Sequence, residues 1–281
     1  MDETFNPTKE TVAMLIYSGT AKGRLSWADL FLKSFLAGAF LSLGALFSII
    51  IDGGAPSLRA NNPSLATLVS SFTFPTGFVI LTILNTELFT ANLFVVVLAT
   101  CLRKTSLREL MRNLVSSYIM NMAGAIFVAG FLCWWSDTLS TDELKSFAVV
   151  QAESRVNVQW SVNFLRGIGC NWLVGLAIFL SISARDQVSK IYAIWIPIWM
   201  FVALGYQHSI ANFFLVPIGM FYGTDFGVGK FIYQSVIPVT LGNVVGAVVL
   251  DGLAIWFLYG REVINKKDES GELTGEACLP T

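Results

Sequence analysis

Residues 205–212 read GYQHSIAN, a polar stretch in the middle of an apolar run that extends from 190 to 221. A second polar stretch, LNTELFTAN at 84–92, interrupts the apolar run 65–101. About 20 apolar residues suffice to span a bilayer, and both of these runs are longer. Backbone without helical hydrogen bonds is tolerated at this depth only inside the protein or along a cavity. We therefore expect two broken transmembrane helices.

The rest of the chain has the composition of a membrane protein. Of its 281 residues, 54% are hydrophobic and 13% are charged, whereas soluble domains contain about 25% charged residues. Six apolar runs are present, at 28–51, 65–101, 110–135, 158–183, 190–221 and 231–260. The expected fold is all-α and integral to the membrane, with six transmembrane helices, of which the second and fifth are broken.

The basic residues predict the orientation of these helices. With both termini in the cytoplasm, inner loops and helix ends carry thirteen Lys and Arg residues, whereas the outer side carries only Arg59, Lys145, Arg155 and Lys230. This bias follows the positive-inside rule. We expect a cytoplasmic N-terminal segment 1–27, a membrane domain 28–260 and a cytoplasmic polar tail 261–281 without structure of its own.

Three short patterns occur twice in the same order. FLAG at 35–38, FTANLF at 89–94 and NMAGA at 121–125 correspond to FLRG at 164–167, SIANFF at 209–214 and NVVGA at 243–247. The order indicates a duplication of 28–135 as 158–260. Each half has three spans, so the halves must be inverted relative to each other. In such proteins the substrate path lies at the interface of the repeats, near the midplane.

Two ionisable groups stand out at the breaks. Glu87 would cost several kcal/mol if left unpaired in hydrocarbon, so it must face protein or water. His208 is the only histidine, and desolvation favours its neutral imidazole, which can still donate a hydrogen bond to an anion. A kinked helix with satisfied polar groups is the alternative. Phe74, Phe78 and Phe201 flank the breaks and are candidates for apolar constrictions, although phenylalanines in such helices usually pack in the core or against lipid.

Other chemistry finds little support in the sequence. A single histidine with scattered carboxylates cannot supply a metal site, and there is neither a glycine-rich phosphate loop nor a Ser/His/Asp or Cys/His arrangement. We expect no metal, no cofactor, no nucleic-acid partner and no enzymatic activity. A structural membrane subunit remains an alternative, but it would have little need for paired polar breaks.

Four ordered motifs resemble the signatures of the formate/nitrite transporter family: TELFTAN at 86–92, RGIGCNWLV at 166–174, HSIANFFLVP at 208–217 and IPVTLGN at 237–243. The resemblance covers about 28–260 and looks strongest toward the fungal nitrite transporters. It implies an aquaporin-like six-helix protomer in a homopentamer with one pore per protomer. By resemblance, the pore residues are Thr90, His208, Asn171, Asn212, Glu87 and Gln207, supported by Asn121 and Asn243, with slits at Phe74, Phe78 and Phe201.

Two positions depart from the family pattern. Arg155 stands where a lysine is common, and a guanidinium attracts an anion but does not give up a proton. Gln207 stands where a glutamate often precedes the histidine. The function expected from the resemblance is nitrite uptake with a proton across the plasma membrane, for nitrate assimilation. Formate or lactate is the alternative substrate.

Overall fold

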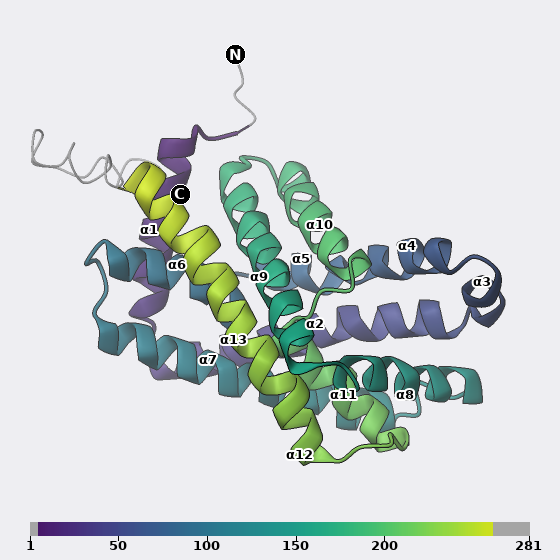
Figure 1. Cartoon of the computed structure of the whole chain (residues 1–281). Helices are drawn as coiled ribbons and strands as arrows, with labels where there is room; N and C mark the ends of the chain where they lie inside the picture. The colour runs from purple at the N-terminus through teal and green to yellow at the C-terminus, as the bar shows by residue number, and fades with distance from the viewer. Residues whose placement is uncertain (1–4, 261–281) are drawn as a thin grey trace, which may run out of the picture.

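A computed structural model describes residues 5–260. All named secondary-structure elements in this range are helices (Figure 1). The first half contains α1 (Thr8–Gly23), α2 (Trp27–Gly53), α3 (Pro56–Asn61), α4 (Pro63–Thr73), α5 (Pro75–Ile83), α6 (Phe89–Cys101), α7 (Leu107–Phe127) and the π-helical η1 (Val128–Trp135). The second half contains α8 (Asp142–Val156), α9 (Trp160–Ser183), α10 (Gln187–Ala203), α11 (Ser209–Tyr222), α12 (Val228–Phe231), η2 (Ile232–Val236), α13 (Ile237–Val245), η3 (Gly246–Leu253) and η4 (Trp256–Gly260).

The expected spans agree with these helices. Five stretches are long and apolar enough to cross a membrane, namely Trp27–Gly53, Pro63–Ile83, Leu107–Trp135, Trp160–Ser183 and Val228–Gly260. The remaining apolar helices, α6, α10 and α11, are shorter because the chain is interrupted between α5 and α6 and again between α10 and α11. The prediction of a second and a fifth broken helix is confirmed.

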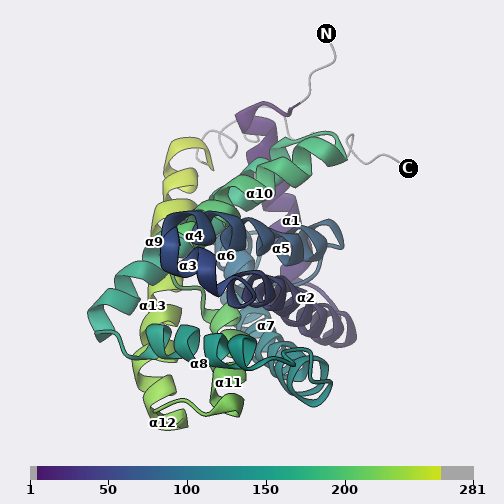
Figure 2. The ribbon, with the colours of Figure 1, turned by 90° about the vertical axis from the view of Figure 1, so that its right-hand side faces the viewer.

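The two halves pack in the same way. α2 packs against α7 as α9 packs against α13, and α1 packs against α6 as α8 packs against α11 (Figures 1 and 2). The long helices approach closely at glycines: a Cβ at Gly38 would overlap the backbone of Asn121, and one at Gly242 would overlap that of Phe164. Small residues commonly permit such contacts between membrane helices.

Each repeat thus includes a further helix, α1 or α8, that no apolar run in the sequence indicates. α1 lies within the expected N-terminal segment 1–27 and buries Val12 and Leu15. α8 lies between the third and fourth spans and buries Ala148, Ala152 and Val156. Each helix is shorter than a membrane span and carries several charged residues, so neither reads as a span in the sequence. The tail 261–281 lies outside the described residues.

The molecule has two ends, which we name the α1 side and the α8 side. On the α1 side, Arg112 of α7 donates to the Gly23 carbonyl at the end of α1, at 2.9 Å. On the α8 side, Asn157 donates to the Asp225 carboxylate in the loop before α12, at 3.2 Å. Figure 2 shows α8 beside α11, away from α1.

Candidate transport site

Two asparagines hold the unwound backbone at the breaks. Asn121 of α7 accepts the Phe89 N–H (2.8 Å) and donates to the Glu87 carbonyl (2.9 Å). Asn243 of α13 accepts the Ser209 N–H (2.8 Å) and donates to the Gln207 carbonyl (3.1 Å). All of these groups would otherwise be unpaired in the membrane interior, where that is costly. The pattern explains why an asparagine follows each break at a similar distance.

A second pair of asparagines holds the side chain that precedes each break helix. Asn92 donates to Glu87 Oε2 at 2.9 Å, and Asn212 donates to Gln207 Oε1 at 3.0 Å. Each amide also binds a neighbour, Asn113 in the first half and Ser235 in the second, both on helices that follow the break in sequence. The repeat is therefore visible in hydrogen bonds as well as in helix packing.

Charge breaks this symmetry. Glu87 is 1% exposed and pairs with Lys22 of α1, whose Nζ lies 2.6 Å from Oε1. The corresponding Gln207 is neutral, and Arg155 of α8 donates instead to the Gln151 carbonyl at 3.1 Å. The α1 side thus has a neutralised ion pair, whereas the α8 side has a cation without a carboxylate at the equivalent position. The Lys22 contact has no signal in the sequence, because no apolar run marks α1.

Thr90 and His208 meet between the two break helices. Thr90 Oγ1 lies 2.9 Å from His208 Nε2, and both side chains are buried. His208 caps α11, because its Nδ1 accepts the Ala211 N–H at 3.1 Å. This bond assigns the proton of the neutral ring to Nε2, so His208 donates to Thr90. The Thr90 hydroxyl hydrogen is then left to donate to a guest molecule.

Asn171 of α9 lies beside this pair. Its Nδ2 donates to the Thr90 carbonyl at 3.1 Å, and its Oδ1 is buried without a partner among the described residues. A buried amide oxygen without a donor is unusual. Asn171 therefore offers an unused acceptor close to Thr90.

A cavity of about 200 Å³ leads toward His208 from the α8 side. Its lining includes His208 with Phe74 and Phe201, and also the two guanidinium-bearing residues Arg155 and Arg166. The Phe74 and Phe201 rings meet edge to face at 5.8 Å, and Phe201 stacks on His208 at 5.9 Å. Two aromatic rings and the imidazole thus lie together in one part of the cavity wall.

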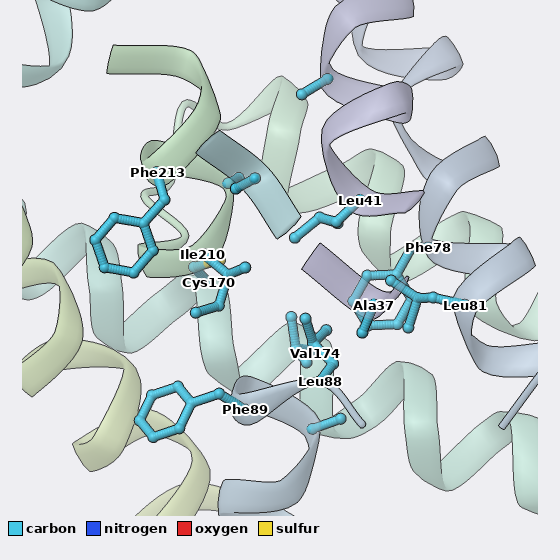
Figure 3. Close-up of a cluster of buried hydrophobic side chains, with 14 of the residues drawn as sticks. Ala37, Leu41, Phe78, Leu81, Leu88, Phe89, Cys170, Val174, Ile210 and Phe213 are labelled. Carbon is cyan, nitrogen blue, oxygen red and sulfur yellow. The ribbon is translucent and has the colours of Figure 1, made fainter. Parts of the chain in front are cut away.

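The expected site residues divide into two groups. Gln207, Asn212, Phe74, Phe201, His208 and Arg155 line the cavity, whereas Thr90, Asn171, Glu87, Asn121, Asn243 and Phe78 do not. Phe78 is fully buried in the cluster drawn in Figure 3, near Ala37 and Leu81. Its role as a constriction stays a prediction, as do the roles of the other residues.

Several residues that the sequence did not single out also contribute. Arg166, Ser48 and Tyr206 line the cavity. Arg166 lies inside the motif RGIGCNWLV, so its position in an apolar span was the available signal. Leu88 occupies the N-cap position of α6, as His208 does in α11, but its fully buried side chain forms no capping hydrogen bond. The first break thus carries an apolar side chain where the second carries the imidazole.

The charge of the cavity is positive. Burial, together with the charge of Arg166, lowers the pKa of Arg155 to about 10, and the guanidinium remains protonated at neutral pH. No Asp or Glu is among the residues that line the cavity. Such a site attracts anions and carries no lining carboxylate to compensate the charge.

Comparison with known proteins identifies the family. The family model described as formate/nitrite transporter matches residues 9–257. A probable formate transporter of Methanothermobacter thermautotrophicus is 34% identical over 93% of this chain and 100% of its own length.

Solved structures agree with this match. An FNT family ion channel has a TM-score of 0.79 and 28% identity, covering 88% of this chain and 98% of its own. A pentameric formate channel with formate bound has a TM-score of 0.72 and 27% identity, covering 82% and 96%. These relatives are transporters and channels rather than enzymes. The chain is a multi-pass membrane protein that belongs to the formate/nitrite transporter family.

Proposed function

We propose that this protein moves a small monovalent weak acid across the membrane together with a proton, through a path that joins the α8-side cavity to Thr90 and His208. The observation that carries the proposal is the cavity: two guanidiniums without a lining carboxylate, and two phenylalanine rings beside the only histidine. Cations attract the anion, and an apolar constriction opposes passage of a charge. An anion that gains a proton can pass such a constriction as the neutral acid.

Desolvation of the substrate anion drives its protonation. Desolvation disfavours the charged form of an acid, so the anion binds a proton more readily as it approaches Phe74 and Phe201. The proton comes from solvent or by way of His208. The second route has a structural cost, because a protonated ring would have to donate from Nδ1, which now accepts the Ala211 N–H. Solvent is therefore the simpler source.

Formate is the substrate that the relatives favour. The relative from Methanothermobacter thermautotrophicus is named a probable formate transporter, and one structural neighbour holds formate. Nitrite, expected from the resemblance to fungal nitrite transporters, is the second candidate, since the family description includes it. Both are small monovalent weak acids.

The assembly and orientation are part of the proposal. The pentameric formate channel among the structural neighbours supports a homopentamer with one path per protomer. The basic bias supports cytoplasmic termini in the plasma membrane. The α1 side then faces the cytoplasm, and the α8-side cavity faces outward.

Liposomes that contain only this protein test the substrate. Labelled formate uptake is measured with unlabelled formate, nitrite or lactate as competitors at a fixed pH. We expect formate and nitrite to compete and lactate to compete less. No uptake of labelled formate or labelled nitrite above protein-free liposomes would refute transport and leave the structural-subunit alternative.

A further inference from the structure

A buried carboxyl group lies in η3, away from the site described above. Asp251 is 6% exposed, and its Oδ2 is buried without a hydrogen-bond partner among the described residues. The carboxyl rests against Gly175 of α9, where any Cβ would overlap it. Glycine at 175 thus provides the space that the carboxyl occupies.

Asp251 lies within a membrane-spanning stretch of the chain. It lies eight residues after Asn243, which holds the second break, and nine residues before Gly260, the end of η4. Asp251 therefore lies in the apolar stretch Val228–Gly260, between the breaks and the α1 side.

No described charge compensates this carboxyl. The elements packed against η3 are α9, α6, α13 and η4. The ionisable side chains of these elements are Arg166 and Cys170 on α9, Cys101 on α6 and Tyr259 on η4. Within residues 5–260, none of them forms an ion pair or hydrogen bond with Asp251. Arg166 is nine residues from Gly175, more than two helical turns away, and it lines the α8-side cavity.

An unpaired carboxylate in this environment would be costly, and intramembrane acids commonly mark proton pathways. The neutral acid avoids most of that cost and requires only hydrogen bonds. Binding is the simple equilibrium in which a carboxylate oxygen takes a proton and forms an O–H bond. Nothing is oxidised or reduced, and no further reactant is required.

Asp251 lies in line with the central pair. Gly175, which it contacts, is four residues after Asn171, so both project from one face of α9. Asn171 binds the Thr90 carbonyl and has an unused Oδ1. The Asp251 carboxyl thus contacts α9 about one helical turn from Asn171, on the α1 side of the central pair.

We propose that Asp251 is a proton-binding site that takes the co-transported proton from the neutral acid after it has passed the central pair and releases that proton to the solution on the α1 side. The transport role rests on the proposed function, whereas proton binding by the buried carboxyl does not. Two observations support the site. Gly175 leaves the space that the carboxyl fills, and the buried oxygens Asn171 Oδ1 and Asp251 Oδ2 have no hydrogen-bond partner among the described residues.

Infrared spectroscopy of the protein in lipid tests proton binding without any substrate. We expect the carbonyl band of a protonated carboxyl group at neutral pH, lost in Asp251→Asn and in Asp251→Ala, and kept in Asp137→Asn. Asp137 is the control because its side chain is 62% exposed and pairs with Lys145. An unchanged spectrum in both Asp251 variants would overturn the site. Using two variants guards against one that fails to fold, and gel filtration verifies each.

Two transport measurements test the relay. Net formate uptake, followed by the pH inside the liposomes, should be at least fivefold slower in Asp251→Asn. Exchange of labelled for unlabelled formate at equal pH should change less than twofold, because exchange moves no net proton. Equal slowing of both, or of neither, would overturn the relay. If wild-type protein moves formate without any pH change, the proposed proton coupling fails instead, and the infrared band still decides whether Asp251 binds a proton.

Discussion

At the scale of single residues, both ring nitrogens of His208 form hydrogen bonds, and the two bonds have different roles. Nδ1 caps α11 through the Ala211 N–H, and Nε2 binds Thr90 at 2.9 Å. The first bond fixes the tautomer on which the second depends. The imidazole therefore orients the Thr90 hydroxyl as a donor, and this follows from the neutral ring alone.

His208→Ala removes the partner of Thr90 and the cap of α11 together. We expect formate uptake to fall at least tenfold, equivalent to about 1.4 kcal/mol or more in the barrier. Thr90→Ser keeps the hydroxyl and should retain most uptake in the same assay. His208→Ala with unchanged uptake, selectivity and pH dependence would exclude a role for the histidine.

Arg155→Lys tests why a guanidinium is present in the cavity. Burial and Arg166 lower the pKa of Arg155 to about 10, and the same causes act on a lysine, whose ordinary pKa is about 10.4. A cation whose pKa is lowered loses its charge as pH rises through that pKa, so the lysine variant should lose anion affinity at a lower pH than wild type. The half-saturating formate concentration is measured from neutral to alkaline pH. Identical profiles would show that only the presence of a positive charge matters.

At the scale of elements, each break helix depends on an asparagine from the helix that follows it. Asn243→Leu keeps the approximate size of the side chain but leaves the Ser209 N–H and the Gln207 carbonyl unpaired. Each buried unpaired group costs about 1–3 kcal/mol, so unfolding in detergent should shift by several kcal/mol. Asn121→Leu should behave alike, and Asn61→Leu, in exposed α3, serves as the control. A shift no larger than that of the control would contradict this account of the breaks.

The Lys22–Glu87 pair ties α1 to the first break. Removal of one partner of a buried pair costs about 3–5 kcal/mol, which we expect for Lys22→Met. The double variant Lys22→Met with Glu87→Gln should recover most of that loss, since Gln207 occupies the equivalent position naturally. A double-mutant cycle in detergent unfolding measures the coupling. Additive losses would show that the 2.6 Å contact is not an important link.

The sequence predicts the broken helices but not the helices that flank them. GYQHSIAN and LNTELFTAN are readable because polar residues interrupt long apolar runs. α1 and α8 are not, because each is shorter than a membrane span and has charged residues among its apolar ones. The Lys22 partner of Glu87 and the position of Arg166 in the cavity depend on contacts between residues far apart in sequence. Such contacts carry no local signal.

At the scale of the whole molecule, the inverted repeat is symmetric in backbone and asymmetric in charge. The α1 half neutralises its lysine with Glu87, whereas the α8 half keeps Arg155 and Arg166 without a lining carboxylate. Substrate anions should therefore be attracted more strongly from the α8 side. The two breaks also differ in the residue before each break helix. His208 lines the cavity at the second break, whereas the apolar Leu88 stands at the first.

The most direct test of weak-acid transport with a proton is the stoichiometry of protons and formate in voltage-clamped liposomes. Our account predicts one proton taken up per formate, with uptake that follows the pH gradient and does not respond to voltage. Formate uptake that responds to voltage and leaves the internal pH unchanged would mean that the bare anion crosses, and would contradict the account.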